Sequence, residues 1–500
     1  MSGQVPVAGD LHGLELSGGM VAQTRPGDGG RFLPGEVAAA RPADLAGAPV
    51  AQPTHRVSVN SSKHSYRYLR PSDIRDGVLG LQTSGGTALR RPAANPLFFT
   101  GFIRHAGVVA AGLCSVAKVA ATRYFRPVPG GLRDPVVTCS GDRLRFESFS
   151  GCGGVYSRLD VLSDALDGEV HDLGTTNVDV GEPLRRMLAR VGGRDPLRLT
   201  VGPDELTVST LDGVAVETKV DLPQRWLKGF AEVQVITAGF EPRAEVPVAE
   251  ATRFLRSLSS AQRARGASWV VPSGRSLRLS SRAVPGAVCL AGPQRLDGLL
   301  PLLPHAKALR VYGPAVTPTS MPCASAWELQ LAGTRLVVVL SPELNRGFSG
   351  EGAVLDFIAG DQVARDAELL GALLAFEPRV ELDLLGERSG LSPDRVRSAV
   401  VGLGLSGQVG YDLAEAAYFH RVLPYDGGLA EQCNPRLRDA RALVRAGAVT
   451  VDGDCARVRG HHIRFTANGP SCSCRWWAEY RGSRGKCKHV LAAELVVGVR

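Results

Sequence analysis

Four candidate metal ligands lie within 18 residues near the C-terminus of this 500-residue chain. Cys472 and Cys474 are followed, after twelve intervening residues, by Cys487 and His489. On an extended backbone, side chains repeat every two residues, so the first pair directs both sulfurs to one face. The second pair completes a tetrahedral set if Cys487 precedes a helix and His489 lies in its first turn. Three thiolates and one imidazole are ligands that Zn²⁺ prefers, so the spacing predicts a zinc site.

A zinc ion held by four protein ligands has no open position for water, which predicts a structural role. Other catalytic motifs are also missing from the sequence. It contains no Gly-Lys-Ser/Thr, no His-Glu-x-x-His and no Gly-x-Ser-x-Gly, although Gly347-Phe-Ser349-Gly350 comes close to the last. We therefore predict a protein that is not an enzyme. An enzyme housed in residues 95–355 is the less favoured alternative.

The order Cys-x-Cys, spacer, Cys-x-His resembles the SWIM zinc finger family, and all four ligand positions match. The resemblance covers about Val449 to Leu495. It implies a strand before the first cysteine, a helix after the last one, and a module that binds nucleic acid or protein. The overall plan resembles uncharacterised actinobacterial SWIM domain proteins, for some of which a role beside AAA+ ATPases is assumed.

The positive charge of the chain is concentrated at the same end. The net charge is +9, and residues 456–500 alone carry nine basic against two acidic side chains. A compact positive segment with interspersed aromatic residues is typical of nucleic-acid binding, because arginine and lysine meet phosphate while aromatic rings stack on unpaired bases. DNA or RNA is thus the predicted partner, and an interaction scaffold for a protein partner such as an ATPase complex is the alternative. The predicted contacts are Arg475, Trp477, Arg481, Arg484, Lys486 and Lys488.

The pattern of the chain predicts an α+β multidomain protein. Residues 1–54 are rich in Gly, Ala and Pro and are expected to be mostly disordered. Residues 55–355 mix short strands with helices and are expected to form one large or two smaller α+β domains. Residues 361–425 read as three helices and a β-hairpin, and residues 432–500 as the module with the ββα zinc finger.

The order of three helices and a hairpin is that of a winged helix. Ser392 is a favourable N-cap and Pro393 suits the first turn of the third helix. If that helix met a DNA major groove, its early residues Asp394, Arg395 and Arg397 would make the contact. Many winged helices hold proteins together instead, and both readings remain open at this point.

The sequence has no apolar run of about 20 residues and no readable secretory signal, so we expect no membrane span and a cytoplasmic protein. In a reducing compartment, clustered cysteines bind metal more often than they form disulfides. The seven other cysteines show no ligand spacing.

Overall fold

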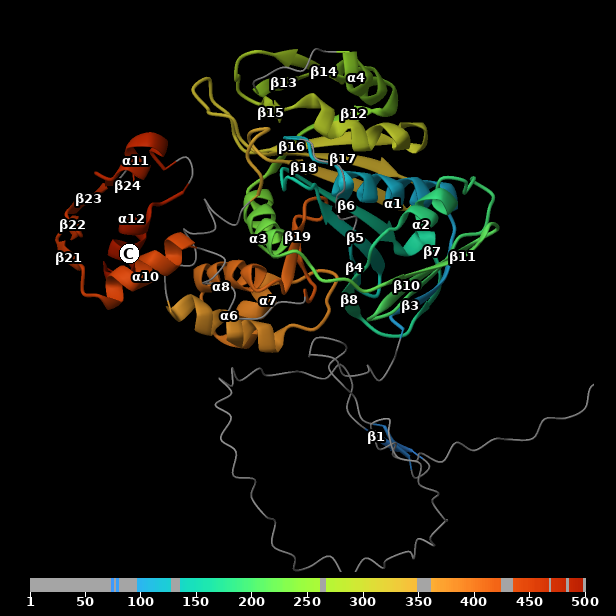
Figure 1. Cartoon of the computed structure of the whole chain (residues 1–500), viewed down its shortest axis with the longest axis horizontal. Helices are drawn as coiled ribbons and strands as arrows, with labels where there is room; N and C mark the ends of the chain where they lie inside the picture. Colours follow the sequence, from blue (N-terminus) through green and yellow to red (C-terminus); the bar gives the residue numbers. More distant parts are fainter. Residues whose placement is uncertain are drawn as a thin grey trace, which may run out of the picture. The chain divides into compact units, whose positions relative to one another are not determined.

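The computed structural model describes residues 73–75, 78–80, 97–126, 135–260, 267–348, 361–423, 435–466, 469–482 and 485–497 (Figure 1). The expected disordered leader, residues 1–54, lies outside this part of the chain. All described residues belong to one compact unit, His64–Arg500. No described helix has both the length and the apolar character needed to cross a membrane. Helices and strands are mixed along the chain, so this is an α+β protein with several sheets. A short antiparallel pair, β1 (Asp73–Arg75) and β2 (Val78–Gly80), comes first.

The first half of the α+β region is built around α1 (Ala106–Ala121). This helix is rich in alanine and valine, and ten of its residues are buried, so it packs as a core element. It contacts two central strands, β5 and β6. The elements of this half are β3 (Phe99–Ile103), α1, β4 (Val136–Cys139), β5 (Arg143–Phe149), β6 (Val155–Leu162), the 3₁₀ turn η1 (Ser163–Ala165), β7 (Leu166–Val170), β8 (Gly174–Asn177), α2 (Glu182–Leu188), β9 (Arg198–Val201), β10 (Glu205–Thr210) and β11 (Gly213–Thr218).

Helix α3 (Gln224–Ala238) connects this half to a second one. Helix α4 is amphipathic and packs against η2, which also contacts α1. The elements of the second half are β12 (Glu241–Pro247), α4 (Val248–Ser260), β13 (Ala267–Ser273), β14 (Ser276–Ser280), β15 (Val288–Ala291), the 3₁₀ helix η2 (Pro293–His305), β16 (Ala308–Gly313), β17 (Ser325–Leu331) and β18 (Thr334–Leu340).

The strands of the two halves pair in the same order. In the first half, a sheet runs β11-β10-β9-β3-β7, and in the second half the order β18-β17-β16-β12 corresponds to its first four strands. The order β5-β4-β8 likewise corresponds to β14-β13-β15. The halves are joined where β18 pairs with β6, which creates an eight-stranded sheet ordered β12-β16-β17-β18-β6-β5-β4-β8. The α+β region is thus an internal duplication in which β6 and β7 have no counterpart between β14 and β15.

Residues 361–423 form three helices and a hairpin with a small core of their own. The elements are α6 (Asp361–Leu373), α7 (Leu382–Ser389), α8 (Pro393–Leu405), β19 (Val409–Asp412) and β20 (Ala417–His420). Ser392 occupies the N-cap position of α8, but its side chain makes no capping hydrogen bond. Helix α8 packs against α3, so this unit lies on the α+β region.

The C-terminal module has more strands than the ββα pattern predicted. Its antiparallel sheet runs β21 (Val449–Asp452), β22 (Cys455–Val458), β23 (His461–Thr466) and β24 (Gly469–Cys472). Three helices accompany it: α10 (Pro435–Arg445), α11 (Arg475–Tyr480) and α12 (Lys488–Val497). Strand β24 was not expected. It places Cys472 at the edge of the sheet, directly beside Ile463.

Candidate metal centre

The four predicted ligands converge on one point. Their ligand atoms all lie within 4.8 Å of one another, and all four side chains are buried. Cys472 ends β24, Cys474 is the N-cap residue of α11, and Cys487 directly precedes α12, whose second residue is His489. Around a tetrahedral Zn²⁺ with Zn–S bonds near 2.3 Å, the ligand atoms stand roughly 3.8 Å apart. The donor set and its spacing therefore fit zinc.

Backbone amides at two helix starts support the cysteine sulfurs. The amide of Trp477 donates to Cys474 Sγ at 3.4 Å, and the amide of Val490 donates to Cys487 Sγ at 3.5 Å. Such bonds favour the thiolate, which is the form that binds metal. The thiol of Cys472 also donates a hydrogen bond that lowers the pKa of Cys487 to about 4, and this bond raises the pKa of Cys472.

The histidine ligand presents Nδ1 to the centre, 4.0 Å from Cys472 Sγ. Its ring lies 4.2 Å from the ring of His461, centroid to centroid. His461 and the exposed His462 are in β23, outside the ligand cluster. A metal ion bound by these four ligands would hold the end of β24 and the starts of α11 and α12 together, as expected for the structural site that the sequence predicts.

A core behind the metal centre shows how the module is stabilised. Apolar residues of α10 and α12 pack against the inner face of the sheet, together with three of the ligands. Trp476 is half-buried, with Arg436 stacked 4.4 Å from its ring, and its Nε1 donates to the carbonyl of Gly485 at 3.4 Å. This contact positions the backbone two residues before Cys487.

These residues match a known family. The model of the SWIM zinc finger matches residues 449–498. The C-terminal module is a SWIM zinc finger. The four cysteine and histidine residues occupy the ligand positions of this finger, which implies a bound metal, with zinc the best fit to the donors. The wider resemblance to actinobacterial SWIM proteins stays a prediction.

Comparisons of the whole chain add little. No curated protein matched it. Among solved structures, proliferating cellular nuclear antigen from Entamoeba histolytica is 11% identical, with a TM-score of 0.33, over 49% of this chain and 99% of that chain. The PCNA2–PCNA3 complex from Sulfolobus tokodaii is 9% identical, with a TM-score of 0.35, over 49% and 98% of the respective chains. Likeness at this level supports no conclusion about this protein.

The predicted nucleic-acid contacts fall into three groups. Arg475 and Arg481, at the two ends of α11, are exposed, and Trp477 is half-buried against Gly482. Lys486 pairs with Glu494 at 2.9 Å, and Lys488 pairs with Asp439 at 3.4 Å, so both lysines are already neutralised within the module. Arg484 lies outside the described residues.

Sequence reasoning missed the outer face of the finger's sheet. Arg457 of β22 is exposed and stands directly opposite His462 of β23, and the exposed Arg464 stands opposite Cys455. The inner face, with Val458 and Ile463, packs on the core. The alternation of polar and apolar residues in these strands carried the signal, because period two assigns Arg457 and Arg464 to the outer face.

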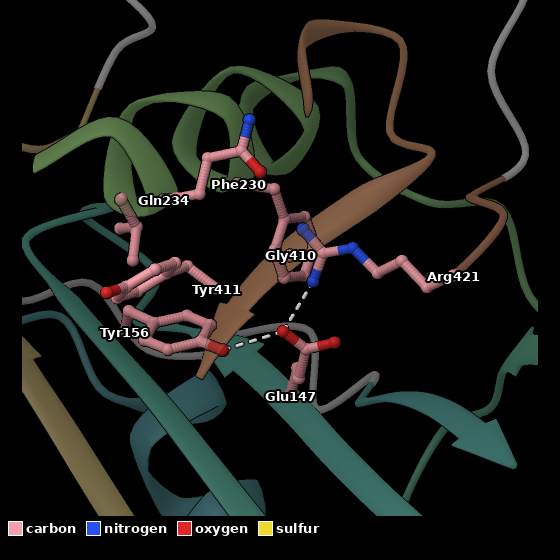
Figure 2. Close-up of a pocket in the computed structure, with 8 residues that line it drawn as sticks. Glu147, Tyr156, Phe230, Gln234, Gly410, Tyr411 and Arg421 are labelled. Carbon is pink, nitrogen blue, oxygen red and sulfur yellow. Dashed lines mark hydrogen bonds and ion pairs between the residues drawn. The ribbon is translucent and has the colours of Figure 1, made fainter. Parts of the chain in front are cut away.

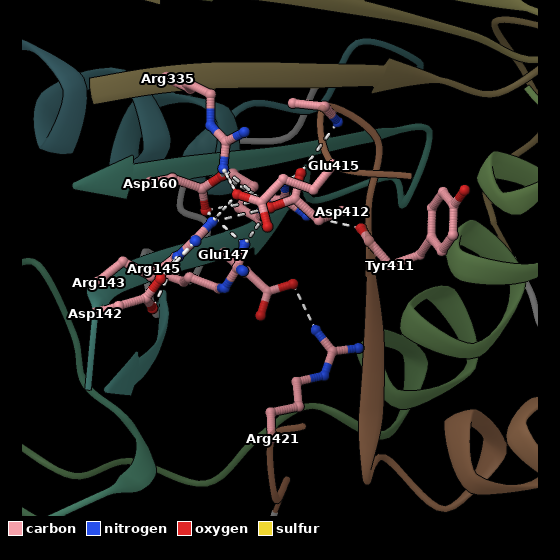
Figure 3. Close-up of polar contacts among 12 residues, drawn as sticks. Asp142, Arg143, Arg145, Glu147, Asp160, Arg335, Tyr411, Asp412, Glu415 and Arg421 are labelled. Carbon is pink, nitrogen blue, oxygen red and sulfur yellow. Dashed lines mark hydrogen bonds and ion pairs between the residues drawn. The ribbon is translucent and has the colours of Figure 1, made fainter. Parts of the chain in front are cut away.

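The winged-helix-like unit does not present a free wing. Its β19–β20 hairpin is turned toward the eight-stranded sheet, and Asp412 of β19 is buried among arginines of that sheet (Figure 3). The carboxylate lies 2.9 Å from Arg145, 3.1 Å from Arg158 and 3.0 Å from Arg335. Burial opposes its ionisation, but these three cations outweigh burial and hold the pKa of Asp412 well below its usual range. The hairpin is therefore part of an intramolecular interface with the eight-stranded sheet.

The expected recognition residues of α8 are also engaged. Arg395 pairs with Asp366 of α6 at 2.7 Å, and Arg397 pairs with Asp394 at 2.6 Å. With the wing buried and both arginines paired, this unit is a poorer candidate for DNA contact than the finger.

A small pocket marks the same interface (Figure 2). Tyr156 donates to Glu147 at 2.6 Å, and Arg421 pairs with Glu147 at 2.5 Å. Gln234 of α3 lies at the pocket, where its buried amide has no hydrogen-bond partner within the described residues. The residues that line this pocket come from the eight-stranded sheet, from α3 and from the β19–β20 hairpin with Arg421 after it, so the pocket lies at the seam between these elements.

Proposed function

We propose that this protein is a non-enzymatic zinc protein whose C-terminal SWIM finger binds nucleic acid. The zinc ion would act as a structural centre, held by Cys472, Cys474, Cys487 and His489. Its role would be to fix the sheet and helices that display basic side chains. The proposal adds a specific class of partner, nucleic acid, to the metal-binding module described above.

One observation carries the proposal. Five arginines of the finger are exposed, and none forms an ion pair within the described part of the chain. Guanidinium groups without a carboxylate partner are available for phosphate, which they bind through paired N–H donors. These arginines are Arg457, Arg459, Arg464, Arg475 and Arg481.

The two lysines that the sequence also suggested contribute less in this proposal. Each would have to leave a carboxylate, Glu494 or Asp439, before it could contact a phosphate. The half-buried Trp477 offers part of its ring for stacking on an unpaired base. Stacking releases no counterions, so its contribution to affinity is expected to be independent of salt.

Salt dependence of binding tests the proposal on the full chain. Labelled single-stranded DNA, single-stranded RNA and duplex DNA are titrated by fluorescence anisotropy at several salt concentrations. If the five arginines contact phosphates of a single strand, the slope of log affinity against log salt is about −3.5, at roughly 0.7 per contact. Replacing Arg457 and Arg464 by Gln should make the slope shallower by about 1.4.

The matched control is the pair Arg379→Gln and Arg397→Gln, which removes two exposed arginines that lie outside the finger and are paired with carboxylates. This control should leave the slope unchanged. Absence of salt-dependent binding to all three probes would contradict the proposal and favour a protein partner for the finger.

A further inference from the structure

Two of the edge strands of the α+β region, β11 and β14, are related to each other by the repeated strand order. Within the described residues, β11 has a strand on one side only, β10, and β14 has a strand on one side only, β13. The strands have similar lengths, six and five residues. An open edge offers unpaired backbone N–H and C=O groups to another strand.

The internal duplication relates these two edges to each other. In the first half, β5 is followed by β6, and β6 pairs with β18, the last strand of the second half, over seven residues. The counterpart of β5 is β14, and the counterpart of β18 is β11. The second half has no counterpart of β6. No described strand therefore pairs with β14 in the way that β6 pairs with β5, and none pairs with β11 in the way that β6 pairs with β18.

Apolar side chains are exposed at both edges. On and beside β11, the exposed fractions are 72% for Leu211, 64% for Val214 and 53% for Val216, and on β14 the value is 45% for Leu279. Val214 and Val216 project from the face of the sheet opposite the buried Leu206 and Val208. Exposed β-branched residues on an open edge indicate a surface that is covered when a further strand is added.

The two edges also carry opposite charge. Residues 204–221, which include β10 and β11, contain five acidic residues and one lysine. Asp204 pairs with Lys219 and Asp212 pairs with Arg190, which still leaves an excess of acidic groups at this edge. Residues 267–282, which include the β13–β14 hairpin and the two residues after it, contain Arg275, Arg278 and Arg282 and no acidic residue. Like edges would repel each other, whereas an acidic edge and a basic edge attract.

We propose that two copies of this chain associate head to tail, with the acidic β11 edge of one copy added to the basic β14 edge of the next. The added strand would take the position beside β14 that β6 has beside β5. The five-stranded and three-stranded sheets would then continue across the interface, as the β6–β18 pairing continues the sheet within the chain. Because each copy has one edge of each kind, the contact is heterologous and leads to a closed ring or an extended chain of copies.

Sedimentation velocity of the full-length protein tests this at several concentrations in low salt. The wild type should form oligomers as concentration rises, and salt should weaken them. Arg278→Glu and Glu205→Arg should each weaken association by at least roughly tenfold, since Arg278 lies on β14 and Glu205 stands on β10 directly beside Thr218 of β11, so each change places like charges near the contact. Val216→Lys should act in the same direction by burying a charge against the added strand. Arg194→Glu is the matched control, because Arg194 is exposed and outside both edges.

Mixing the two single variants separates an interface effect from misfolding. Arg278→Glu and Glu205→Arg chains should each sediment as monomers, but an equimolar mixture should associate, because the reversed edges attract each other. A wild type that stays monomeric over the whole concentration range would overturn the proposal. So would oligomers that survive Arg278→Glu, Glu205→Arg and Val216→Lys unchanged.

Discussion

The guanidinium of Arg145 on β5 lies 2.9 Å from the carboxylate of Asp412 on β19, and both side chains are fully buried. The two residues are 267 positions apart in the sequence. Their contact fixes the hairpin of the winged-helix-like unit on the eight-stranded sheet. A buried charge without a partner is costly, so removal of one member of the ion-pair cluster around Asp412 is expected to destabilise the folded protein.

Replacing Asp412 by Asn should strongly destabilise the protein. The change leaves Arg145, Arg158 and Arg335 to share the buried carboxylate of Asp160, and the loss of a buried ion-pair partner costs about 3–5 kcal/mol of unfolding free energy. Denaturant unfolding measures the effect. Asp394→Asn, which breaks an exposed pair with Arg397, should change stability by no more than about 0.5 kcal/mol. Equal effects of the two substitutions would contradict the role given to Asp412.

The same carboxylate predicts a pH dependence. Its folded-state pKa lies well below the ordinary value, so its contribution to stability is fully present above that ordinary value. The contribution falls as pH decreases from about 5 toward the folded-state pKa. The stability difference between wild type and Asp412→Asn should therefore shrink between about pH 5 and pH 3. A constant difference over this range would show that Asp412 is not held ionised.

Gly404 of α8 permits a close approach to α3. A Cβ at this position would lie 1.0 Å from Nε2 of the buried Gln234. Glycine to alanine in a helix normally stabilises by up to about 1 kcal/mol, but here we expect a loss of about 1–3 kcal/mol from overpacking. Adding Gln234→Ala should restore most of the loss. Thermal unfolding of the single and double variants measures both effects, and a stabilising Gly404→Ala would contradict the packing described.

Metal content tests the finger itself. The purified protein should carry one zinc ion per chain, and Cys472→Ala, Cys474→Ala, Cys487→Ala or His489→Ala should abolish its retention. Cys455→Ser is the control, because Cys455 is exposed and outside the ligand cluster. After chelation, hydrogen exchange should accelerate in residues 449–497 while residues 97–348 stay protected, since metal binding energy is folding energy in such modules. A folded, reduced protein without metal would refute the site.

The sequence predicted the parts of this structure that depend on local pattern. Ligand spacing identified the metal centre, and the alanine-rich run identified α1. Helix α3 was not predicted. It buries Trp226 and Phe230 on the sheet and Gln234 beside α8. Because the helix packs against two neighbours, its buried residues do not form the single apolar stripe by which a helix is predicted. The burial of the wing could not be predicted either, because it depends on Asp412 meeting arginines more than 70 residues away along the chain.

Trp477 separates stacking from charge in the proposed binding. If its ring stacks on a base, Trp477→Ala should weaken single-strand binding by about 1–3 kcal/mol and leave the salt slope unchanged. Trp477→Phe should retain most of the affinity, because a ring remains. Anisotropy titrations at fixed and varied salt measure both quantities. A change in slope without a change in affinity at fixed salt would assign Trp477 no stacking role.

The central claim, that the zinc-held finger is the nucleic-acid-binding element, is tested most directly by photocrosslinking. Full-length, zinc-loaded protein is irradiated with thiouridine-labelled RNA or thiothymidine-labelled DNA, and the crosslinked peptides are identified by mass spectrometry. The account predicts crosslinks within residues 449–498, reduced by Arg457→Gln with Arg464→Gln and lost on chelation. Crosslinks confined to the winged-helix-like unit or the α+β region, or binding that survives chelation unchanged, would contradict it.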